Sequence, residues 1–342
     1  MAKKPLPKLL IIDGNALIHR SFHALPPTLT TKKGEMVNAV YGFTMVLIKA
    51  LKEIKPEYVI LTLDKKGPTF RHQVFKEYKA QRIKAPKELY QQISKVKAIA
   101  NAFSIPIYSQ KGYEADDLIG SICFQVGDKA EKIILTGDLD VLQLVNDNTK
   151  VYTMHRGLSD HIIYDEAMVR QRFGLKPCQL VDFKALRGDP SDNIPGVRGV
   201  GEKTAITLLQ HFGTLENVYS FLDKKSNKEP KFLTARLRRL LLEHKQEAFL
   251  SKKLATIKTN LPLEINLKKA RFGKFNQDAI VCLFQELEFK SLLPRLHDLS
   301  PLPKVPDSKF IRNQTQFNYH LIEEEKDFQA FLKRLKRATE FV

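Results

Sequence analysis

The stretch Ile133-Ile134-Leu135-Thr136-Gly137-Asp138 is a short apolar run that ends in an aspartate. Two earlier runs share this design, Leu9-Leu10-Ile11-Ile12-Asp13 and Tyr58-Val59-Ile60-Leu61-Thr62-Leu63-Asp64. Continuous apolarity over so few residues is typical of central parallel strands that are buried on both faces. Helical stretches at residues 39–54 and 88–103 lie between these runs. The alternation predicts an α/β fold with a doubly wound, mostly parallel sheet over residues 1–172.

The second half of the chain has a different pattern. After about Phe173 the strand signals fade, and helices are expected at residues 204–212 and 231–254. Residues 173–297 are therefore predicted to form an all-α unit. Three prolines then mark a linker over residues 298–316, because proline disfavours regular structure. Beyond the linker, a strand at 317–322 and a helix at 326–335 are expected within a final segment, residues 317–342.

The charge balance indicates the kind of partner. The 342 residues include 56 Lys and Arg against 38 Asp and Glu, which gives a formal net charge of +18. Such an excess favours a polyanion, with nucleic acid as the first candidate and an anionic membrane surface as the second. The longest apolar stretch, residues 39–48, is half of the roughly 20 residues that a membrane-spanning helix needs.

Two further patterns bear on location and redox chemistry. Asp13 interrupts the first apolar run before it reaches the length of a signal peptide, so a cytoplasmic protein is expected. Cys123, Cys178 and Cys282 are odd in number and far apart. They favour neither a disulfide framework nor a zinc site.

Acidic residues gather where the predicted strands end. One such aspartate is equally well explained as a helix cap, but three in register indicate a site at the sheet edge. Three carboxylates within residues 114–117 would repel one another unless a cation lay between them. All-oxygen ligands favour Mg²⁺ or Mn²⁺ over zinc. The candidate metal ligands are Asp13, Asp64, Glu114, Asp116, Asp117, Asp138, Asp140, Asp189 and Asp192.

Basic residues concentrate in a different segment. Residues 65–97 contain ten Lys and Arg against Glu77 and Glu88, with Phe70, Phe75 and Tyr78 interleaved. A solvated helix face would normally mix the signs of charge. The pattern therefore favours a strand of nucleic acid held by phosphate contacts and stacking.

A glycine-rich turn supplies a second candidate for phosphate binding. Residues 196–205 read Gly-Val-Arg-Gly-Val-Gly-Glu-Lys-Thr-Ala, which departs from a P-loop because Glu202 separates Gly201 from Lys203. Two glycine turns that lead into a helix predict a helix-hairpin-helix over residues 186–212. Its backbone N–H groups would hold a DNA phosphate regardless of base.

The histidines give no comparable signal. His19, His23 and His72 have no ligand spacing, and they are interpreted as packing or hydrogen-bonding residues. No Ser-His-Asp or Cys-His arrangement follows from spacing, so covalent nucleophilic catalysis is not predicted.

Five segments together resemble the 5′-nuclease domain at the N-terminus of bacterial DNA polymerase I, a relative of phage 5′ nucleases and flap endonucleases. They are residues 11–24 (IIDGNALIHRSFHA), 63–82 (LDKKGPTFRHQVFKEYKAQR), 112–121 (GYEADDLIGS), 134–145 (ILTGDLDVLQLV) and 186–205 (LRGDPSDNIPGVRGVGEKTA). The resemblance covers about residues 8–295 and implies a PIN/FEN-like fold with a helical arch over residues 65–97. It also implies that residues 317–342 begin a 3′–5′ exonuclease-like domain.

The resemblance assigns roles to individual residues. It implies that the nine carboxylates hold two catalytic divalent metals, and that Lys79 and Arg82 steer the scissile phosphate. It implies a K⁺ site at the helix-hairpin-helix. The implied DNA contacts are Arg20, Arg71, Gly196, Arg198, Gly199, Gly201, Lys203 and Thr204. Tyr78 is a further predicted DNA contact, from its place in the basic, aromatic segment.

The expected function is that of a monomeric, metal-dependent 5′–3′ exonuclease and flap endonuclease. Its partners would be DNA flaps, nicks and 5′ ends in Okazaki-fragment processing and repair. One alternative is a DNA-binding scaffold of the same fold that no longer cleaves, although none of the nine carboxylates is missing. A second is a phosphatase that uses a phosphoaspartate at the Asp138-Leu139-Asp140 pair.

Overall fold

The computed structural model describes residues 5–82, 84–154, 157–158, 160–224, 230–296, 299 and 325–335. The chain forms two compact units, residues 1–300 and residues 301–342. In the second unit the structure describes one helix, α14 (Glu325–Leu335), which confirms the helix expected there. The expected strand at 317–322 and almost all of the linker at 298–316 lie outside the described residues.

The first unit is built on one six-stranded sheet with the order β3-β2-β1-β4-β5-β6. Strands β1 to β5 run parallel and β6 pairs antiparallel with β5. The predicted mostly parallel sheet is therefore confirmed, and the antiparallel edge strand is an addition. The bounds are β1 Lys8–Asp13, β2 Tyr58–Thr62, β3 Ile107–Tyr108, β4 Glu131–Thr136, β5 Thr149–Met154 and β6 His161–Tyr164.

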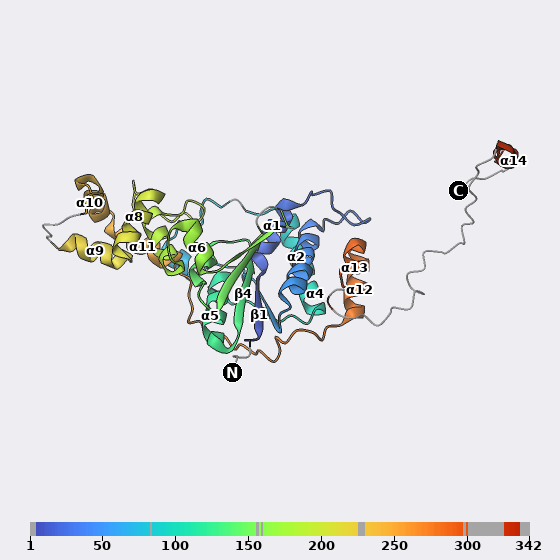
Figure 1. The fold of residues 1–342 in the computed structure, drawn as a ribbon, viewed down its shortest axis with the longest axis horizontal. Coiled ribbons are helices and arrows are strands. Elements are labelled where there is room, and N and C mark those ends of the chain that lie inside the picture. Colours follow the sequence, from blue (N-terminus) through green and yellow to red (C-terminus); the bar gives the residue numbers. More distant parts are fainter. Residues whose placement is uncertain are drawn as a thin grey trace. The chain divides into compact units, whose positions relative to one another are not determined.

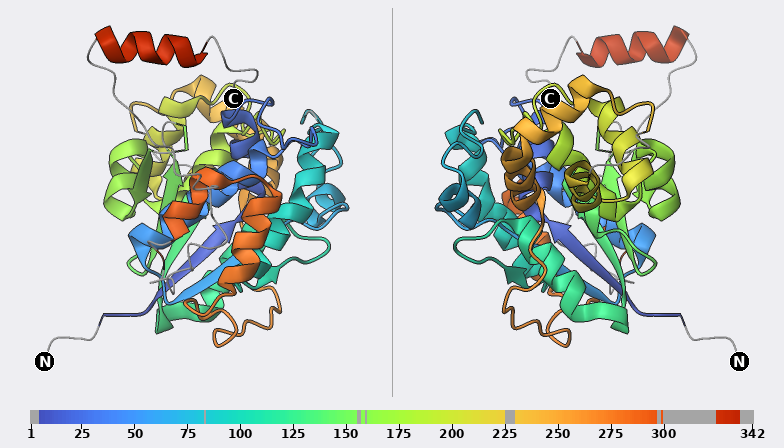
Figure 2. Two further views of the ribbon diagram at one scale, coloured as in Figure 1. Left: turned by 90° about the vertical axis from the view of Figure 1, so that its right-hand side faces the viewer. Right: turned by 90° about the vertical axis from the view of Figure 1, so that its left-hand side faces the viewer.

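Helices cover both faces of this sheet, because alternate residues of each central strand point to opposite sides. In β1, Leu10 and Ile12 pack with α1 (Gly14–Ala24), α2 (Asn38–Ile54) and α4 (Lys87–Ala102). Leu9 and Ile11 pack instead with α5 (Ala115–Val126) on the opposite face. Figures 1 and 2 show the sheet between these layers. The doubly wound fold is confirmed.

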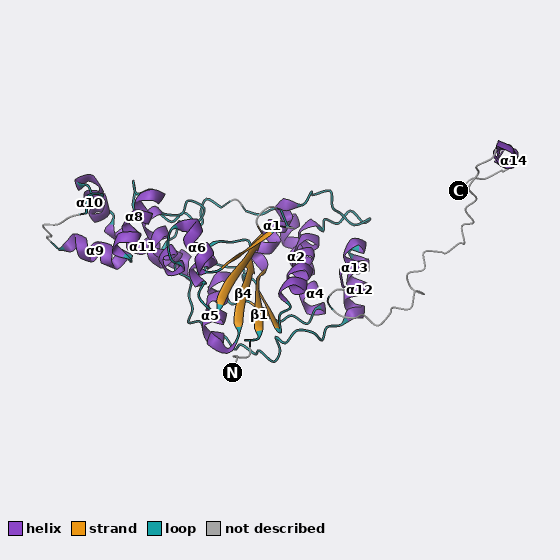
Figure 3. Ribbon diagram, in the orientation of Figure 1, coloured by secondary structure: helices purple, strands orange, loops and turns teal. Residues whose placement is uncertain are grey.

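A group of helices follows the sheet, as Figure 3 shows. The expected helix at 204–212 is present, whereas the stretch at 231–254 is divided in two at His244. Helix α7 packs against α8 and α11. The bounds are α6 Glu166–Phe173, α7 Leu180–Arg187, α8 Glu202–Phe212, α9 Leu215–Asp223, α10 Ala235–Glu243 and α11 Lys245–Ala255.

The chain then returns to the α/β layer, which corrects the prediction of one all-α unit over residues 173–297. Val59 N–H donates to the Ala270 carbonyl at 2.8 Å, so residues near 270 extend the hydrogen bonding of β2. Ile280 and Phe284 of α12 (Gln277–Glu286) are buried in the same core as α2 and α4. The short α13 (Leu293–Leu296) follows.

The basic segment is also less helical than expected. Between β2 and α4 it contains one short helix, α3 (Phe70–Val74), followed by hydrogen-bonded turns over residues 75–82. The end of the segment belongs to α4, whose apolar face is buried against the sheet. Within the described ranges, no helix is both long enough and apolar enough to cross a bilayer.

Candidate active site

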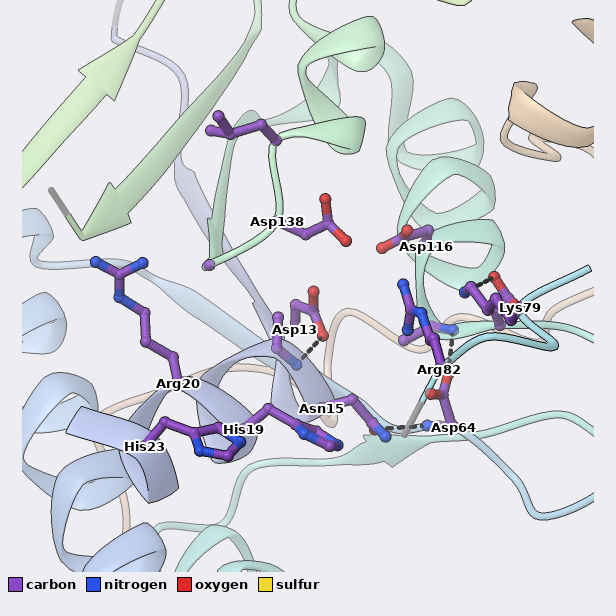
Figure 4. Close-up of a pocket in the computed structure, with 15 residues that line it drawn as sticks. Asp13, Asn15, His19, Arg20, His23, Asp64, Lys79, Arg82, Asp116 and Asp138 are labelled. Atoms are coloured by element: carbon purple, nitrogen blue, oxygen red, sulfur yellow. Dashed lines mark hydrogen bonds and ion pairs between the residues drawn. The ribbon is translucent and has the colours of Figure 1, made fainter. Parts of the chain in front are cut away.

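A cavity of about 540 Å³ opens at the edge of the sheet where the parallel strands end. Its acidic walls come from the ends of β1, β2 and β4 and from the first turn of α5. Figure 4 shows Asp13, Asp116 and Asp138 pointing toward one another, with Lys79 and Arg82 on one side and Arg20 on another. The lining includes Asp13, Asn15, His19, Arg20, His23, Asp64, Lys79, Arg82, Glu114, Asp116 and Asp138.

Asp13, Asp116 and Asp138 form the first of two kinds of acidic group. None of the three has an ion-pair partner in the part of the chain that the structure describes. Asp13 is 3% exposed and accepts hydrogen bonds from the Ala16 N–H at 3.0 Å and the Thr136 hydroxyl at 2.7 Å. We call these three residues the unpaired acidic group.

The pKa values of Asp13 and Asp116 reflect burial first and mutual repulsion second. Burial, with added repulsion from Asp138 and Asp64, outweighs the two hydrogen bonds and raises the pKa of Asp13 to about 7. Burial also raises the pKa of Asp116 well above its ordinary value, with added repulsion from Asp138 and Asp13. Carboxylates held this close without a cation store repulsion that a bound cation would relieve.

Asp64 connects the two walls of the cavity. Its Oδ1 accepts a hydrogen bond from the Ala115 N–H at 2.7 Å, at the start of α5. Its own N–H donates to the Asn15 side chain at 2.8 Å, in α1. Asp64 therefore fixes the end of β2 relative to the starts of α1 and α5.

The second kind of acidic group is paired with basic side chains. The Lys79 ammonium lies 2.9 Å from Glu114 and 3.7 Å from Asp192, and Arg82 lies 2.6 Å from Asp192. Burial lowers the pKa of Lys79, but Glu114 and Asp192 outweigh it and the net shift is upward. Lys79 and Arg82 are thus charged, close to the cavity and held by carboxylates.

Lys184 of α7 pairs with two more of the predicted ligands, Asp140 and Asp189. Burial raises the pKa of Asp140 to about 6, with repulsion from Asp138, although Lys184 opposes the shift. For Asp189 the balance is reversed, since Lys184 and Ser191 overcome burial and lower its pKa to about 2. We call Glu114, Asp140, Asp189 and Asp192 the paired acidic group.

Asp117 is not placed to be a metal ligand, which corrects that prediction. It is fully buried, and its two oxygens accept hydrogen bonds from Arg71 at 2.7 and 2.9 Å. It also accepts from the backbone N–H groups of Glu114 and Lys258. A carboxylate with this many partners has no room for a cation, so Asp117 is a structural residue.

Arg71 and Tyr78 are likewise not placed to touch DNA. Arg71 is 3% exposed and is bound by Asp117 and by the Leu254 carbonyl. Tyr78 is also 3% exposed, and its hydroxyl donates to Glu114 at 3.2 Å and to Asp192 at 3.1 Å. Both predicted DNA contacts are wrong for this geometry, because the two side chains are buried and bind the carboxylates of Asp117, Glu114 and Asp192.

The hairpin between α7 and α8 has the predicted glycine turns, with Gly196 and Gly199 at positive φ. Gly196 is enclosed: a Cβ there would lie 2.2 Å from Gly188 N, and its N–H donates to the Ser251 hydroxyl. The Gly196 N–H is therefore not available to a phosphate, which corrects that prediction. Arg198, Gly199, Gly201 and Lys203 are exposed and Thr204 is half-buried. The K⁺ site stays a prediction.

Several site residues were missed from the sequence. His19 and His23 line the cavity beside Arg20, four residues apart on α1, whereas the sequence pattern indicates packing or hydrogen-bonding residues and does not place them at the site. His72 does hydrogen-bond, to Thr69 at 2.9 Å. Thr136 and Lys184 are further polar partners of the carboxylates, and the Asn15 side chain accepts from the Asp64 backbone N–H. The signal that would have identified His19 and His23 is their helical spacing on the helix that begins directly after Asp13.

Comparison with known proteins agrees with this architecture. Residues 8–174 match the family model described as "5'-3' exonuclease, N-terminal resolvase-like domain". Residues 175–278 match "5'-3' exonuclease, C-terminal SAM fold". DNA polymerase I of Chloroflexus aurantiacus is 42% identical over 309 residues, which are 88% of this chain and 32% of that protein. DNA polymerase I of Bacillus subtilis is 41% identical over 84% of this chain and 32% of that protein.

The chain thus spans about a third of the length of these curated relatives. Among solved structures, T5 5′-exonuclease with bound divalent metal ions (zinc) has a TM-score of 0.57 at 21% identity, covering 86% of this chain and all of that one. The catalytic core of Rad2 with DNA substrate has a TM-score of 0.56 at 17% identity, covering 85% and 93%. These structures share the fold. On the two family models and the polymerase I relatives, the chain belongs to the 5′–3′ exonuclease family.

Proposed function

We propose that this chain hydrolyses phosphodiester bonds of DNA at 5′ ends and 5′ flaps with the help of divalent cations. The observation that carries the proposal is the cavity of about 540 Å³ in which Asp13, Asp116 and Asp138 face Lys79 and Arg82. Carboxylates suit cations and the two basic side chains suit phosphate oxygens. A phosphodiester lying between these walls would contact both.

The donor set fits Mg²⁺ or Mn²⁺. All candidate ligands are carboxylate oxygens, and Asp13 is a buried carboxylate without an ion-pair partner among the described residues. Within those residues, no three His, Cys, Asp or Glu side chains enclose a metal site by themselves. Mg²⁺ does not need such an enclosure, because it keeps several waters and takes one or two carboxylates together with substrate phosphates.

Two groups of residues would hold the cations. The unpaired acidic group and Asp64 line the cavity directly. Asp140, Asp189 and Asp192 would serve a second position. Asp140, Asp192 and Glu114 line one small pocket there, and Lys184 joins Asp189 to Asp140. When bound, a divalent cation would neutralise phosphate charge and lower the pKa of the water that attacks the phosphate.

The remaining chemistry belongs to the chain itself. Thr136 and the Ala16 N–H orient the Asp13 carboxylate, and Asn15 orients the end of β2 through Asp64. Lys79 and Arg82 offset the negative charge that builds on the phosphate during hydrolysis. Arg198 and Lys203, exposed beside the hairpin, would hold the duplex by its backbone and without base specificity.

The relatives suggest the biological setting that we propose. Proteins similar over most of this chain are DNA polymerases I, and a fold neighbour was solved with DNA substrate. We infer a role in Okazaki-fragment processing and DNA repair, as the N-terminal part of a polymerase I and as a cytoplasmic monomer. Selection of a flap would follow from junction shape and a 5′ end.

The decisive experiment is cleavage of a 5′-labelled flap with Mg²⁺, compared with the same reaction in EDTA. We expect cleavage with Mg²⁺, none in EDTA, and loss of activity in Asp138→Asn. Asp160→Asn, which neutralises an aspartate outside the cavity lining, is the matched control. Full activity in EDTA would contradict the metal-assisted mechanism. Flap binding without cleavage would support the scaffold alternative, and hydrolysis of a small phosphate ester alone would support the phosphatase.

A further inference from the structure

One asparagine from the hairpin segment holds the turn that carries Lys79 and Arg82. The Asn193 side-chain amide donates to the Glu77 carbonyl at 2.7 Å, and its oxygen accepts from the Gln81 side chain at 3.5 Å. The Asn193 side chain therefore contacts the turn over residues 77–82 on both sides of Lys79, at Glu77 and at Gln81. Beside it, the Lys79 N–H donates to the Asp192 carbonyl at 3.0 Å.

The backbone of this turn is conformationally unusual. Lys79 has a φ of 56°, in the left-handed region that few residues other than glycine adopt. Such conformations persist only where surrounding contacts over-determine them, and they concentrate at functional sites. Asn193 also has a φ of 56°, which asparagine tolerates better than most residues. Each of the two contacting segments thus carries one left-handed residue.

The segment that carries Asn193 leads directly into the hairpin. Asp189 and Ile194 exchange backbone hydrogen bonds at 2.9 and 2.8 Å, which closes the loop between them. Gly196 follows two residues later and is anchored to Ser251 of α11. Asn193 therefore connects the hairpin on one side with the turn of Lys79 on the other.

We propose that Asn193 is a positioning residue that sets Lys79 and Arg82 against the acidic walls and links their position to the hairpin. This inference rests on the proposed nuclease function. Lys79 and Arg82 reach Glu114 and Asp192 only while the turn keeps its left-handed residue. Without the Asn193 amide, the Glu77 carbonyl keeps its bond from the Ala80 N–H but loses its contact with the hairpin segment.

Two variants separate the side chain from the backbone. Asn193→Ala removes the amide and also disfavours a positive φ, whereas Asn193→Gly removes the amide and leaves the backbone relaxed. Asn217→Ala is the matched control, because Asn217 also donates from its side chain to a backbone carbonyl, that of Phe212 at 2.9 Å. All variants are made in the full 342-residue chain.

Hydrogen exchange and single-turnover cleavage are the two readouts. We expect faster amide exchange over residues 77–82 in both Asn193 variants than in wild type. At saturating flap, cleavage should slow by roughly 10- to 100-fold, as expected when a positioned group is misplaced. The Kd for duplex in EDTA should be unchanged, and Asn217→Ala should match wild type in all three measurements.

A double-mutant cycle tests the route of the effect. If Asn193 acts through Lys79 and Arg82, then Asn193→Gly should cause no further loss of rate in a background that carries both Lys79→Ala and Arg82→Ala. Additive losses, or exchange over residues 77–82 that does not change, would overturn the proposal. The exchange result stands whether or not the chain cleaves DNA, so an inactive wild type would refute the proposed function and leave the role of Asn193 to be judged separately.

Discussion

The unpaired and paired acidic groups are neighbours, yet they differ in the counter-charge that the fold gives them. Asp13, Asp116 and Asp138 face one another without basic partners among the described residues, and burial raises the pKa of Asp13 and Asp116. The paired group is different: Asp189, held by Lys184, has a pKa lowered to about 2. A carboxylate that keeps its charge without a partner needs a cation from outside.

The two groups differ in the source of their counter-charge, which basic side chains of the fold supply to one group and not to the other. In the paired group the fold supplies the counter-charge, so the carboxylates can stabilise the folded state without a ligand. In the unpaired group the folded state is destabilised until a cation arrives. Activity and stability should therefore respond in opposite directions to changes in the unpaired group.

Asp116→Asn should give the largest effect. We expect flap cleavage with Mg²⁺ to fall by about 10³-fold or more, since one charge-stabilising interaction is worth several kcal/mol in the transition state. The melting temperature in EDTA should rise, because one of three mutually repelling carboxylates is neutralised. Cleavage rates and thermal melts check both halves. A lower melting temperature would contradict the claim that repulsion within the unpaired acidic group destabilises the folded state.

Asp117→Asn should have the opposite pattern, with a large loss of stability and little effect on Mg²⁺ binding. Its partner Arg71 is 3% exposed, and removing one member of a buried ion pair costs about 3–5 kcal/mol. We expect a large loss in the free energy of unfolding, measured with urea. The fraction that remains folded should still bind Mg²⁺, as titration calorimetry would show. Loss of Mg²⁺ binding at full stability would return Asp117 to the set of metal ligands.

Lys79→Ala should slow single-turnover cleavage by about 10²-fold, as expected for the loss of one charge-stabilising group. It should also leave Glu114 without its closest cation, which lies at 2.9 Å. Lys76→Ala, an exposed lysine three residues away, is the matched control. Equal cleavage rates in the two variants would show that Lys79, although it pairs with Glu114, contributes no more to cleavage than an exposed surface lysine.

A smaller effect concerns pH. The folded-state pKa of Asp13 is raised from 3.8 to about 7, so the folded state binds the proton more tightly than the unfolded state. Stability in EDTA should then fall as pH rises from about 4 to 7, by at most about 1.4 kcal/mol per pH unit for one proton. Urea unfolding across this range should show the slope, and Asp13→Asn should reduce it. An unchanged slope in Asp13→Asn would show that Asp13 is not the group whose raised pKa makes stability depend on pH.

The smallest effect is expected away from the cavity. Arg198→Ala should weaken duplex binding a few-fold and reduce the slope of log affinity against log salt by about 1, as for the loss of one phosphate contact. The cleavage rate at saturating flap should not change. Fluorescence anisotropy at several salt concentrations measures both quantities. A slower rate at saturation would show that the hairpin takes part in more than binding.

Much of the fold was predictable because its signals are local. The apolar runs at β1, β2 and β4 identify buried parallel strands by composition alone, and each ends near an aspartate. Since parallel strands finish at one sheet edge, the strand pattern alone is enough to place Asp13, Asp64 and Asp138 together. The return of residues 256–296 to the sheet carries no such local signal.

The charged contacts were not predictable in the same way. Arg71 and Tyr78 stand in a basic, aromatic segment that is typical of DNA contacts, yet both are buried against Glu114, Asp117 and Asp192. Their partners lie 36 to 114 residues away in the sequence. Periodicity reports which face of an element is apolar, and it does not report which distant charge a buried cation will meet.

The sequence by itself determined the layered α/β architecture, the acidic sheet edge and the excess of positive charge. These follow from strand and helix periods and from composition, which are properties of neighbouring residues. The tertiary structure alone decided which carboxylates are left without partners, which cations hold the acidic wall, and that Asn193 contacts the turn of Lys79. Those outcomes depend on pairs of charges and hydrogen-bonding groups brought together across distant segments, where burial sets the free energy of each ion.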